Sequence, residues 1–416
     1  MEQSAFVPSL IWVNPFACLL LSIAILPLAA PGFWESNLRK LLVSAVLIAP
    51  VIGLYLAHDP VAVAHTARDY LSFIILLSSL FVTSGGVAVR GDLEARPWVN
   101  TTFLAVGGLF ASFIGTTGAS MLFIRPLLHT NAERRYVVHT VVFFIFLVSN
   151  IGGCLTPLGD PPLFLGYLAG VPFWWTFRLT PMWMLTMAVV LVIYFIWDTM
   201  MHRKESPGSL ARDATKTLPL TVAGKANLLL LGGIVAATAL LSAPWREFAM
   251  VTFAGVSWFR TPAHVHRINH FTLHPIVEVA VVFLGIFFTM VPALTLLRVR
   301  GAELGVRHAW QYFWATGILS ALLDNAPTYL AFLAVGQGQN LTPEVAGVPH
   351  AILKAISAGA VFMGGLTYIG NGPNFMVRSI AESRGIKMPS FGGYMLYSGA
   401  ILIPVFIIVT LVFFTA

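Results

Sequence analysis

Charged residues and cysteines are scarce in this sequence. Asp, Glu, Lys and Arg make up 10% of its 416 residues, against about 25% in ordinary globular chains. The two cysteines, Cys18 and Cys154, both lie in apolar segments, which argues against a disulfide framework. Residues 1–9 contain no Lys or Arg. We therefore expect no secretory signal with a basic start, and the first apolar run is predicted to be a retained span.

Apolar residues dominate the chain, at 57% of its residues with a mean hydropathy of +0.83. Long runs such as PMWMLTMAVVLVIYFIW (181–197) are continuous rather than alternating. They predict helices, because only helices and closed barrels satisfy every backbone hydrogen bond in lipid. We expect an all-α polytopic membrane protein. The formal net charge of +7 is explained by basic loops on one membrane face and requires no nucleic-acid partner.

Hydropathy in a window of about 19 residues predicts about ten transmembrane helices. The predicted spans are 10–31, 38–56, 69–89, 137–170, 181–201, 226–243, 246–261, 275–297, 350–383 and 394–414. Two further apolar stretches, 100–128 and 309–336, are interrupted by the polar segments GTTGAS and LDNAPT. A helix, a polar tip and a second helix predict a re-entrant hairpin.

The Lys and Arg residues predict the orientation of these spans. With both hairpins re-entrant, most basic loop residues fall on one face, which the positive-inside rule makes cytoplasmic. Both termini are then outside, and we expect a bacterial inner-membrane location. The first hairpin would enter from the cytoplasm and the second from outside, so the two halves of the chain would be inverted.

Two sequence comparisons indicate an internal repeat. A shift of 208 places pairs Thr116 with Asp324, and a shift of 211 places LTPLGDPPLFL (155–165) on LTYIGNGPNFM (366–376), with five identities in eleven positions. We therefore divide the chain into a first repeat (1–201), a charged cytoplasmic linker (202–225) and a second repeat (226–416). The segments 137–170 and 350–383 are predicted to be broken helices. Inverted repeats with broken helices at mid-membrane are typical of secondary transporters.

Asp160 lies between a glycine and two prolines inside an apolar segment. Such residues remove helical hydrogen bonds, and the freed carbonyls and half-helix ends can bind an ion. A carboxylate within the membrane costs about 2.5–3.5 kcal/mol on insertion scales, and burial favours the protonated form of a carboxyl group. We predict that Asp160 and Asp324 exchange H⁺ for Na⁺. Neutral oxygen ligands suit a hard cation, and the candidates are Asn150, Asn325, Asn371, Asn374, Thr116, Thr117, Ser120, Ser149, Thr156, Thr328 and Thr367.

Each ionisable residue also has a structural alternative. Asp160 could cap the following half-helix, and Asp324 could form an ion pair with a basic side chain. Glu278, one turn into an apolar span, could relay protons or form a structural hydrogen bond. Three basic residues lie inside predicted segments and more than two residues from their ends, and they could pair with an Asp or contact an anionic substrate. They are Arg125, Lys354 and Arg378.

The histidine-rich segment 264–274 and His139 each have two interpretations. HVHRINHFTLH (264–274) contains four histidines, which could form a metal or pH-sensing site. With no Cys or carboxylate beside them, we expect a solvated loop. His139 lies inside a span and could shuttle protons, but we interpret it as a neutral, hydrogen-bonded core residue.

At these motifs the chain resembles the ion transporter superfamily, which includes NhaD-type sodium/proton antiporters, arsenite permeases, the melanosomal P protein and citrate or dicarboxylate carriers. NIGGCLTPLGDPP (150–162) resembles the arsenite-permease and P-protein pattern, and LDNAPT (323–328) resembles the NhaD hairpin tip. HPIVEVAVVFLGIFFTMVPAL (274–294) is similar to bacterial proteins labelled citrate or sodium transporters. The resemblance implies a scaffold, a moving transport domain that carries both hairpins, an elevator mechanism and a homodimer.

Two departures from the family patterns concern the substrate. Leu163 follows GDPP where the arsenite type has Asn, although Asn374 occupies the equivalent place in the second half. SNI at 149–151 matches only part of the Ser-Asn-Thr signature of sodium-coupled dicarboxylate carriers. Both departures weaken the case for an organic-anion site.

The function predicted from these features is a Na⁺ (or Li⁺)/H⁺ antiporter without a cofactor, and not an enzyme. The alternative is a Na⁺- or H⁺-coupled symporter of citrate or another organic anion, in which Lys354 or Arg378 would contact the substrate. An arsenite permease is a further possibility. An intramembrane aspartyl protease could use Asp160 and Asp324, but its Gly-x-Gly-Asp motif is interrupted by Pro157.

Overall fold

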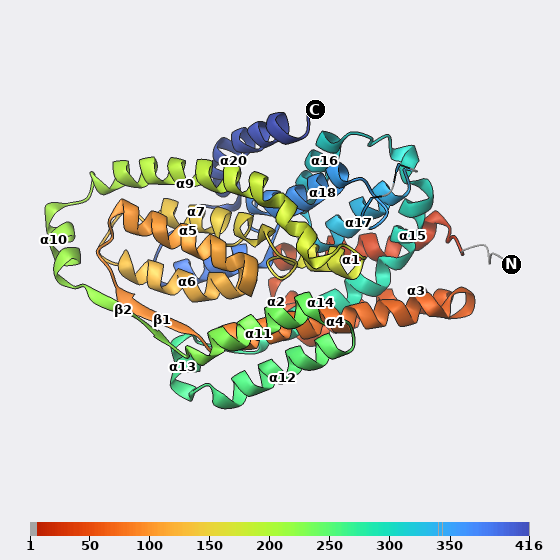
Figure 1. Cartoon of the computed structure of the whole chain (residues 1–416), viewed down its shortest axis with the longest axis horizontal. Coiled ribbons are helices and arrows are strands. Elements are labelled where there is room, and N and C mark those ends of the chain that lie inside the picture. Colours follow the sequence, from red (N-terminus) through yellow and green to blue (C-terminus); the bar gives the residue numbers. More distant parts are fainter. Residues whose placement is uncertain (1–5, 340, 343, 416) are drawn as a thin grey trace.

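The computed structural model describes residues 6–339, 341–342 and 344–415, and Figure 1 shows a molecule built almost entirely of helices. Among these residues, six helices are long and apolar enough to cross a membrane, and the bent pair of α14 (His274–Thr289) and α15 (Val291–Arg300) makes a seventh candidate. Shorter apolar helices and broken helices account for further predicted spans. The predicted all-α polytopic class is confirmed.

The long helices follow the predicted spans closely. They are α1 (Asn14–Ala29), α3 (Asn37–His58), α4 (Pro60–Gly85), α9 (Thr180–His202) and α20 (Phe391–Phe413). Only α4 differs by more than a few residues, because it begins nine residues before the predicted start at residue 69. Arg68 and Asp69 lower the hydropathy there. The helix nevertheless starts earlier because Pro60 occupies its first turn and the Asp59 carboxylate accepts a hydrogen bond from the Ala62 amide at 3.1 Å.

The helices form two groups. In the first helix group, α3 packs on α14 and α4 packs on α12 (Trp245–Arg260), with α1 and α11 (Ala226–Leu240) beside them. Figure 1 shows α3, α4, α11 and α12 along the lower side of the molecule. The second helix group contains both predicted hairpins, both broken helices, α9 and α20. Every residue that we predicted to bind an ion belongs to this second group.

Both predicted hairpins consist of two helices that pack together. The first is α5 (Pro97–Ile114) and α6 (Thr116–Thr130), which are joined at Gly115. Gly115 has a φ of +81°, a conformation that glycine adopts most easily. The second is α16 (Ala309–Leu322) and α17 (Asn325–Gln337). That the two hairpins enter the membrane from opposite faces stays a prediction.

Both predicted broken helices are also present. The first runs from α7 (Val138–Leu147) through a short 3₁₀ turn to α8 (Pro161–Leu168), and the second from α18 (His350–Met363) through another to α19 (Gly372–Ser383). Gly159 and Gly370 lie at the two breaks, where a Cβ atom would collide with a carbonyl oxygen of the opposing strand of chain. Glycine is therefore required at both positions for the chain to leave the helix.

The linker 202–225 contains regular secondary structure, which its charged composition did not predict. It contains α10 (Pro207–Thr215) and β2 (Leu218–Ala223). β2 pairs antiparallel with β1 (Ala88–Asp92), and the two strands form what we call the ribbon. β1 connects α4 to α5, and β2 connects α10 to α11. Two of the connections between the helix groups therefore run side by side in the ribbon (Figure 1).

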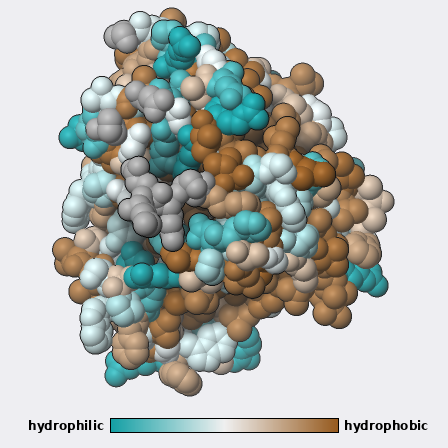
Figure 2. All heavy atoms as spheres, turned by 90° about the vertical axis from the view of Figure 1, so that its right-hand side faces the viewer, coloured by the Kyte–Doolittle hydropathy of each residue, from teal (hydrophilic) through white to brown (hydrophobic). Residues whose placement is uncertain are grey.

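The surface agrees with a protein surrounded by lipid. Figure 2 shows one end of the molecule, where hydrophilic residues lie across the face and hydrophobic residues gather on its right-hand side. Large apolar side chains are exposed along the helices of both groups, among them Val46, Leu229, Phe248, Leu396 and Leu411. Such extensive exposed apolar surface is expected where a helix contacts lipid rather than water.

Candidate functional site

Asp160 lies at the point where both hairpins and both broken helices meet. Its side chain is 1% exposed. The Oδ1 atom accepts hydrogen bonds from Thr116 Oγ1 at 2.9 Å and from Asn371 Nδ2 at 3.0 Å, and Oδ2 accepts one from Asn325 Nδ2 at 2.6 Å. All three donors are electrically neutral. We call Asp160, Thr116, Asn325 and Asn371 the Asp160 cluster.

The backbone places Asp160 at the start of α8, but its carboxylate does not cap that helix. The alternative that Asp160 serves as a helix cap is therefore wrong. The prolines at positions 161 and 162 have no amide hydrogen to offer a capping group, which leaves the carboxylate free to point across the site. Residues from α6 and α17 then supply its donors.

Asp324 has a different environment. It precedes α17, and its Oδ1 accepts a hydrogen bond from the Ala326 amide at 3.0 Å. Within the described part of the chain, no Lys or Arg forms an ion pair with Asp324, so the predicted alternative of a structural ion pair finds no support. Its neighbour in the sequence, Asn325, donates to Asp160. The side chain of Asp324 is half-buried.

A network of asparagine amides extends from the Asp160 cluster. Asn150 Nδ2 donates to Asn374 Oδ1 at 2.7 Å, and Asn371 Nδ2 also donates to the Ser149 carbonyl at 3.1 Å. Both contacts join the two halves of the chain, as does the contact of Asn371 with Asp160. Rotation of an amide by 180° exchanges its oxygen and its nitrogen. The same side chains can therefore donate hydrogen bonds to a carboxylate that has no bound proton or cation, or present oxygens to a bound cation.

Three of the seven predicted hydroxyl ligands donate to backbone carbonyls in this structure. Thr156 donates to the Ser112 carbonyl, and Thr367 donates to the Ala321 carbonyl at 2.5 Å, so each break is fastened to a hairpin helix. Thr328 donates to the carbonyl of Asp324 at 2.9 Å. The remaining hydroxyls are buried or half-buried nearby, with Ser120 Oγ and Ser149 Oγ 2.8 Å apart and Thr117 at the tip of the first hairpin.

The predicted relay and anion-contacting residues have partners outside the Asp160 cluster. Glu278 Oε1 lies 2.5 Å from Lys40 Nζ, a side chain that is only 3% exposed. Arg378 forms an ion pair with Glu382 at 2.9 Å. Lys354 lines a separate cavity of about 370 Å³. None of the three predicted residues forms a hydrogen bond with Asp160 or Asp324 among the residues that the structure describes.

Comparison with known families identifies the class of the protein. A family described as "putative citrate transport" matches residues 5–414. The chain belongs to this family. A comparison with curated proteins gives no match. Membership over nearly the whole chain confirms the predicted resemblance to citrate-transporter-like proteins. Together with the apolar helices, it makes the protein a multi-pass membrane transporter.

One buried charged cluster in this family member was missed from the sequence. Asp198 Oδ1 lies 2.6 Å from Arg134 Nη2 and 2.8 Å from His139 Nε2, and all three side chains are buried. Asn100 donates to the second carboxylate oxygen at 3.1 Å. Asp198 is an acidic residue inside a predicted span, and this position alone indicates that its carboxylate has a buried partner. His139 is a hydrogen-bonded core residue, as predicted.

The histidine-rich segment is partly helical, whereas we expected a loop. A short helix, α13 (Ala263–Ile268), occupies its first half, and His264, His270 and His274 are exposed. The residues that the structure describes contain no group of three His, Cys, Asp or Glu side chains that could hold a metal ion.

Proposed function

We propose that this transporter exchanges Na⁺ or Li⁺ for H⁺ at the Asp160 cluster. The observation that carries the proposal is a buried carboxylate whose three hydrogen-bond partners are all neutral. A buried carboxylate without a basic partner is stabilised by binding either a proton or a small cation. Because both compete for one group, release of one accompanies binding of the other. This competition is sufficient for antiport.

Asp324 and the amide network would complete the cation site. The Oδ2 atom of Asp324 has no hydrogen-bond partner among the described residues, so it can bind a cation while Oδ1 still caps α17. Carboxylate and amide oxygens are suitable ligands for a hard cation. We assign the central role to Asp160 and a supporting role to Asp324.

The arrangement of the two helix groups supports alternating access. All residues of the Asp160 cluster belong to the second helix group, so this group could carry the site as one unit past the first. An elevator movement, a homodimer, a bacterial inner membrane and both termini outside are part of this proposal.

Proton/cation exchange can be measured in everted vesicles or proteoliposomes. Dissipation of a pH gradient after addition of Na⁺, Li⁺ or K⁺ is compared for the native chain, Asp160→Asn and the control Glu382→Gln, which also replaces a carboxylate by an amide but far from the cluster. We expect Na⁺- or Li⁺-dependent dissipation to be lost only in Asp160→Asn. Full activity of Asp160→Asn would contradict the proposal.

Citrate transport is the second candidate, since the family description names it. In that case Asp160 would bind a coupling Na⁺ or H⁺, and the asparagine amides could donate hydrogen bonds to the substrate carboxylates. A Na⁺ gradient would then drive citrate uptake, and Na⁺ alone would leave the pH gradient unchanged. Arsenite added in the same assay tests the permease alternative. The family description names transport, so we do not propose a protease.

A further inference from the structure

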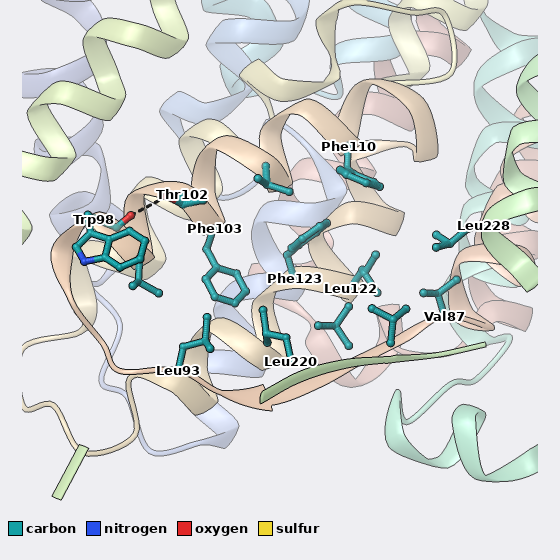
Figure 3. Close-up of a pocket in the computed structure, with 14 residues that line it drawn as sticks. Val87, Leu93, Trp98, Thr102, Phe103, Phe110, Leu122, Phe123, Leu220 and Leu228 are labelled. Carbon is teal, nitrogen blue, oxygen red and sulfur yellow. Dashed lines mark hydrogen bonds between the residues drawn. The ribbon is translucent and has the colours of Figure 1, made fainter. Parts of the chain in front are cut away.

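Two cavities adjoin at the ribbon, on the side of the molecule that we predict to be cytoplasmic. The first is an apolar groove of about 340 Å³ between the ribbon and the α5–α6 hairpin. Figure 3 shows Phe103, Phe110 and Phe123 along its hairpin side and Leu220 on its ribbon side. Two lining side chains carry a polar group. The Thr102 hydroxyl already donates to the Trp98 carbonyl at 2.8 Å, and the Trp98 indole N–H lies at one end of the groove. Between them the groove offers apolar contact.

The second cavity, of about 310 Å³, is strongly basic. Val89 and Leu122 line both cavities, so the two are neighbours. The basic lining residues come from β1, α6 and the end of α19, and they are Arg90, Arg125, His129 and Arg384.

The charges of this second cavity are not balanced by the protein. His129 lies 3.3 Å from Asp92. Arg90, Arg125 and Arg384 form no ion pair within the part of the chain that the structure describes. Arg125 is also half-buried. A half-buried guanidinium without a carboxylate partner loses hydration, and an anionic ligand would restore its interactions.

The dimensions and position of the groove fit one lipid tail. From Trp98 to Phe110 the groove follows twelve residues of α5, or about 18 Å at the helical rise. Half of a bilayer's hydrocarbon core is about 15 Å thick. Trp98 is 60% exposed at the outer end of the groove, and tryptophan favours the interface between lipid and water. The cytoplasmic leaflet is also where anionic lipids attract basic residues.

We propose that the two cavities form one binding site for an anionic phospholipid. Arg125 and Arg384 would bind its phosphate group, and an acyl chain would lie along Phe103 and Phe110. The proposal does not depend on which solute is transported. Because α6 carries Thr116 of the Asp160 cluster at its other end, the lipid would contact the element that supplies part of the ion site.

Lipid binding can be measured on the full chain in detergent by native mass spectrometry. Dioleoyl phosphatidylglycerol is compared with zwitterionic dioleoyl phosphatidylcholine. We expect the native chain to prefer phosphatidylglycerol. The double variant Arg125→Gln/Arg384→Gln should bind it about thirtyfold more weakly, since each basic residue contributes about fivefold. The control Arg203→Gln/Lys204→Gln, which alters exposed basic residues elsewhere, should bind like the native chain.

A second pair of variants tests the groove without changing charge. Val106→Trp introduces a large side chain on the groove side of α5, and Leu109→Trp introduces the same side chain on an exposed part of that helix outside the groove. Only Val106→Trp should weaken binding of both lipids, while their affinity ratio stays the same. Equal binding of the two lipids by the native chain would overturn the proposal. So would competition by inorganic phosphate or citrate together with native-like binding by Val106→Trp, which would indicate a site for a soluble anion.

Discussion

The two breaks at Asp160 and Asn371 share a backbone but differ in charge. Asp160 has φ −145° and ψ 142°, and Asn371 has φ −156° and ψ 139°. In both, a proline follows in the first turn of the next helix, and a threonine four residues earlier donates to a hairpin carbonyl. Yet one side chain is a carboxylate and the other is the amide that donates to it at 3.0 Å. The repeated backbone provides the geometry, while the charge is present in one copy only.

The two hairpin tips show the same division. Thr116 begins α6 and donates to Asp160, whereas Asp324, its counterpart in the numbering shift, caps α17. The first hairpin therefore contributes a neutral donor, and the second contributes a carboxylate that serves its own helix. A site assembled in this way is asymmetric although its framework is repeated. In the proposed exchange, this asymmetry would leave a single central carboxylate for which protons and cations compete.

Moving the charge between the breaks should have the largest effect. Asp160→Asn should reduce Na⁺-dependent exchange by about a hundredfold. Replacing a residue that only hydrogen-bonds to a metal ligand typically costs about 10–100-fold in metal affinity or activity, and loss of the ligand itself should cost at least as much. The double variant Asp160→Asn/Asn371→Asp restores one carboxylate on the equivalent backbone and should recover part of the exchange. A folded double variant as inactive as the single variant would show that the surroundings of Asp160, and not the shared backbone, determine activity.

Asp324→Asn should have a smaller effect, because asparagine caps a helix about as well as aspartate does. We expect unchanged thermal stability and an apparent Na⁺ affinity lower by about tenfold, as for the loss of one supporting ligand. Asp324→Ala, which also removes the cap, should lower the free energy of unfolding by about 1 kcal/mol. If Asp324→Asn abolishes exchange as Asp160→Asn does, the two carboxylates have equal roles.

The breaks and hairpins could be predicted because their signals are local. Glycine, proline and polar residues interrupt apolar runs at GDPP, GNGP, GTTGAS and LDNAPT, and the structure leaves the helix at each of them. Span boundaries failed where a cap outweighed hydropathy, as at Asp59. The family resemblance could also be recognised from the sequence, because each of its motifs is a continuous stretch of residues.

Partners distant in the sequence could not be predicted. The ribbon pairs Ala88 with Ala223, and both strands are too short to show a clear periodicity. Asp160 and Asp324 both looked like buried carboxylates, and only the fold shows that one caps a helix. Lys40 lies at the start of the predicted span 38–56, and no local pattern indicates that its side chain pairs with Glu278 on another helix.

The threonine braces should stabilise both breaks. Thr156→Val removes the bond to the Ser112 carbonyl and one that the hydroxyl accepts from the Leu158 amide. Thr367→Val removes the bond to the Ala321 carbonyl and two that the hydroxyl accepts from backbone amides. Each variant should therefore lower the free energy of unfolding by about 1 kcal/mol or somewhat more. Thermal unfolding in detergent measures both under identical conditions. A loss confined to one variant would mean that only one break depends on its brace, and the equivalence of the two backbones would not extend to their stability.

Glu278→Gln should have the smallest effect on exchange, because the ion pair with Lys40 lies in the first helix group, away from the Asp160 cluster. Glu278 is 42% exposed, so water can replace much of its interaction with Lys40, and we expect a stability loss of about 1 kcal/mol or less. Exchange should stay within about twofold of the native rate. Measuring both quantities separates the two alternatives for this residue. Loss of exchange with preserved stability would make Glu278 a proton relay and would extend the functional region beyond the second helix group.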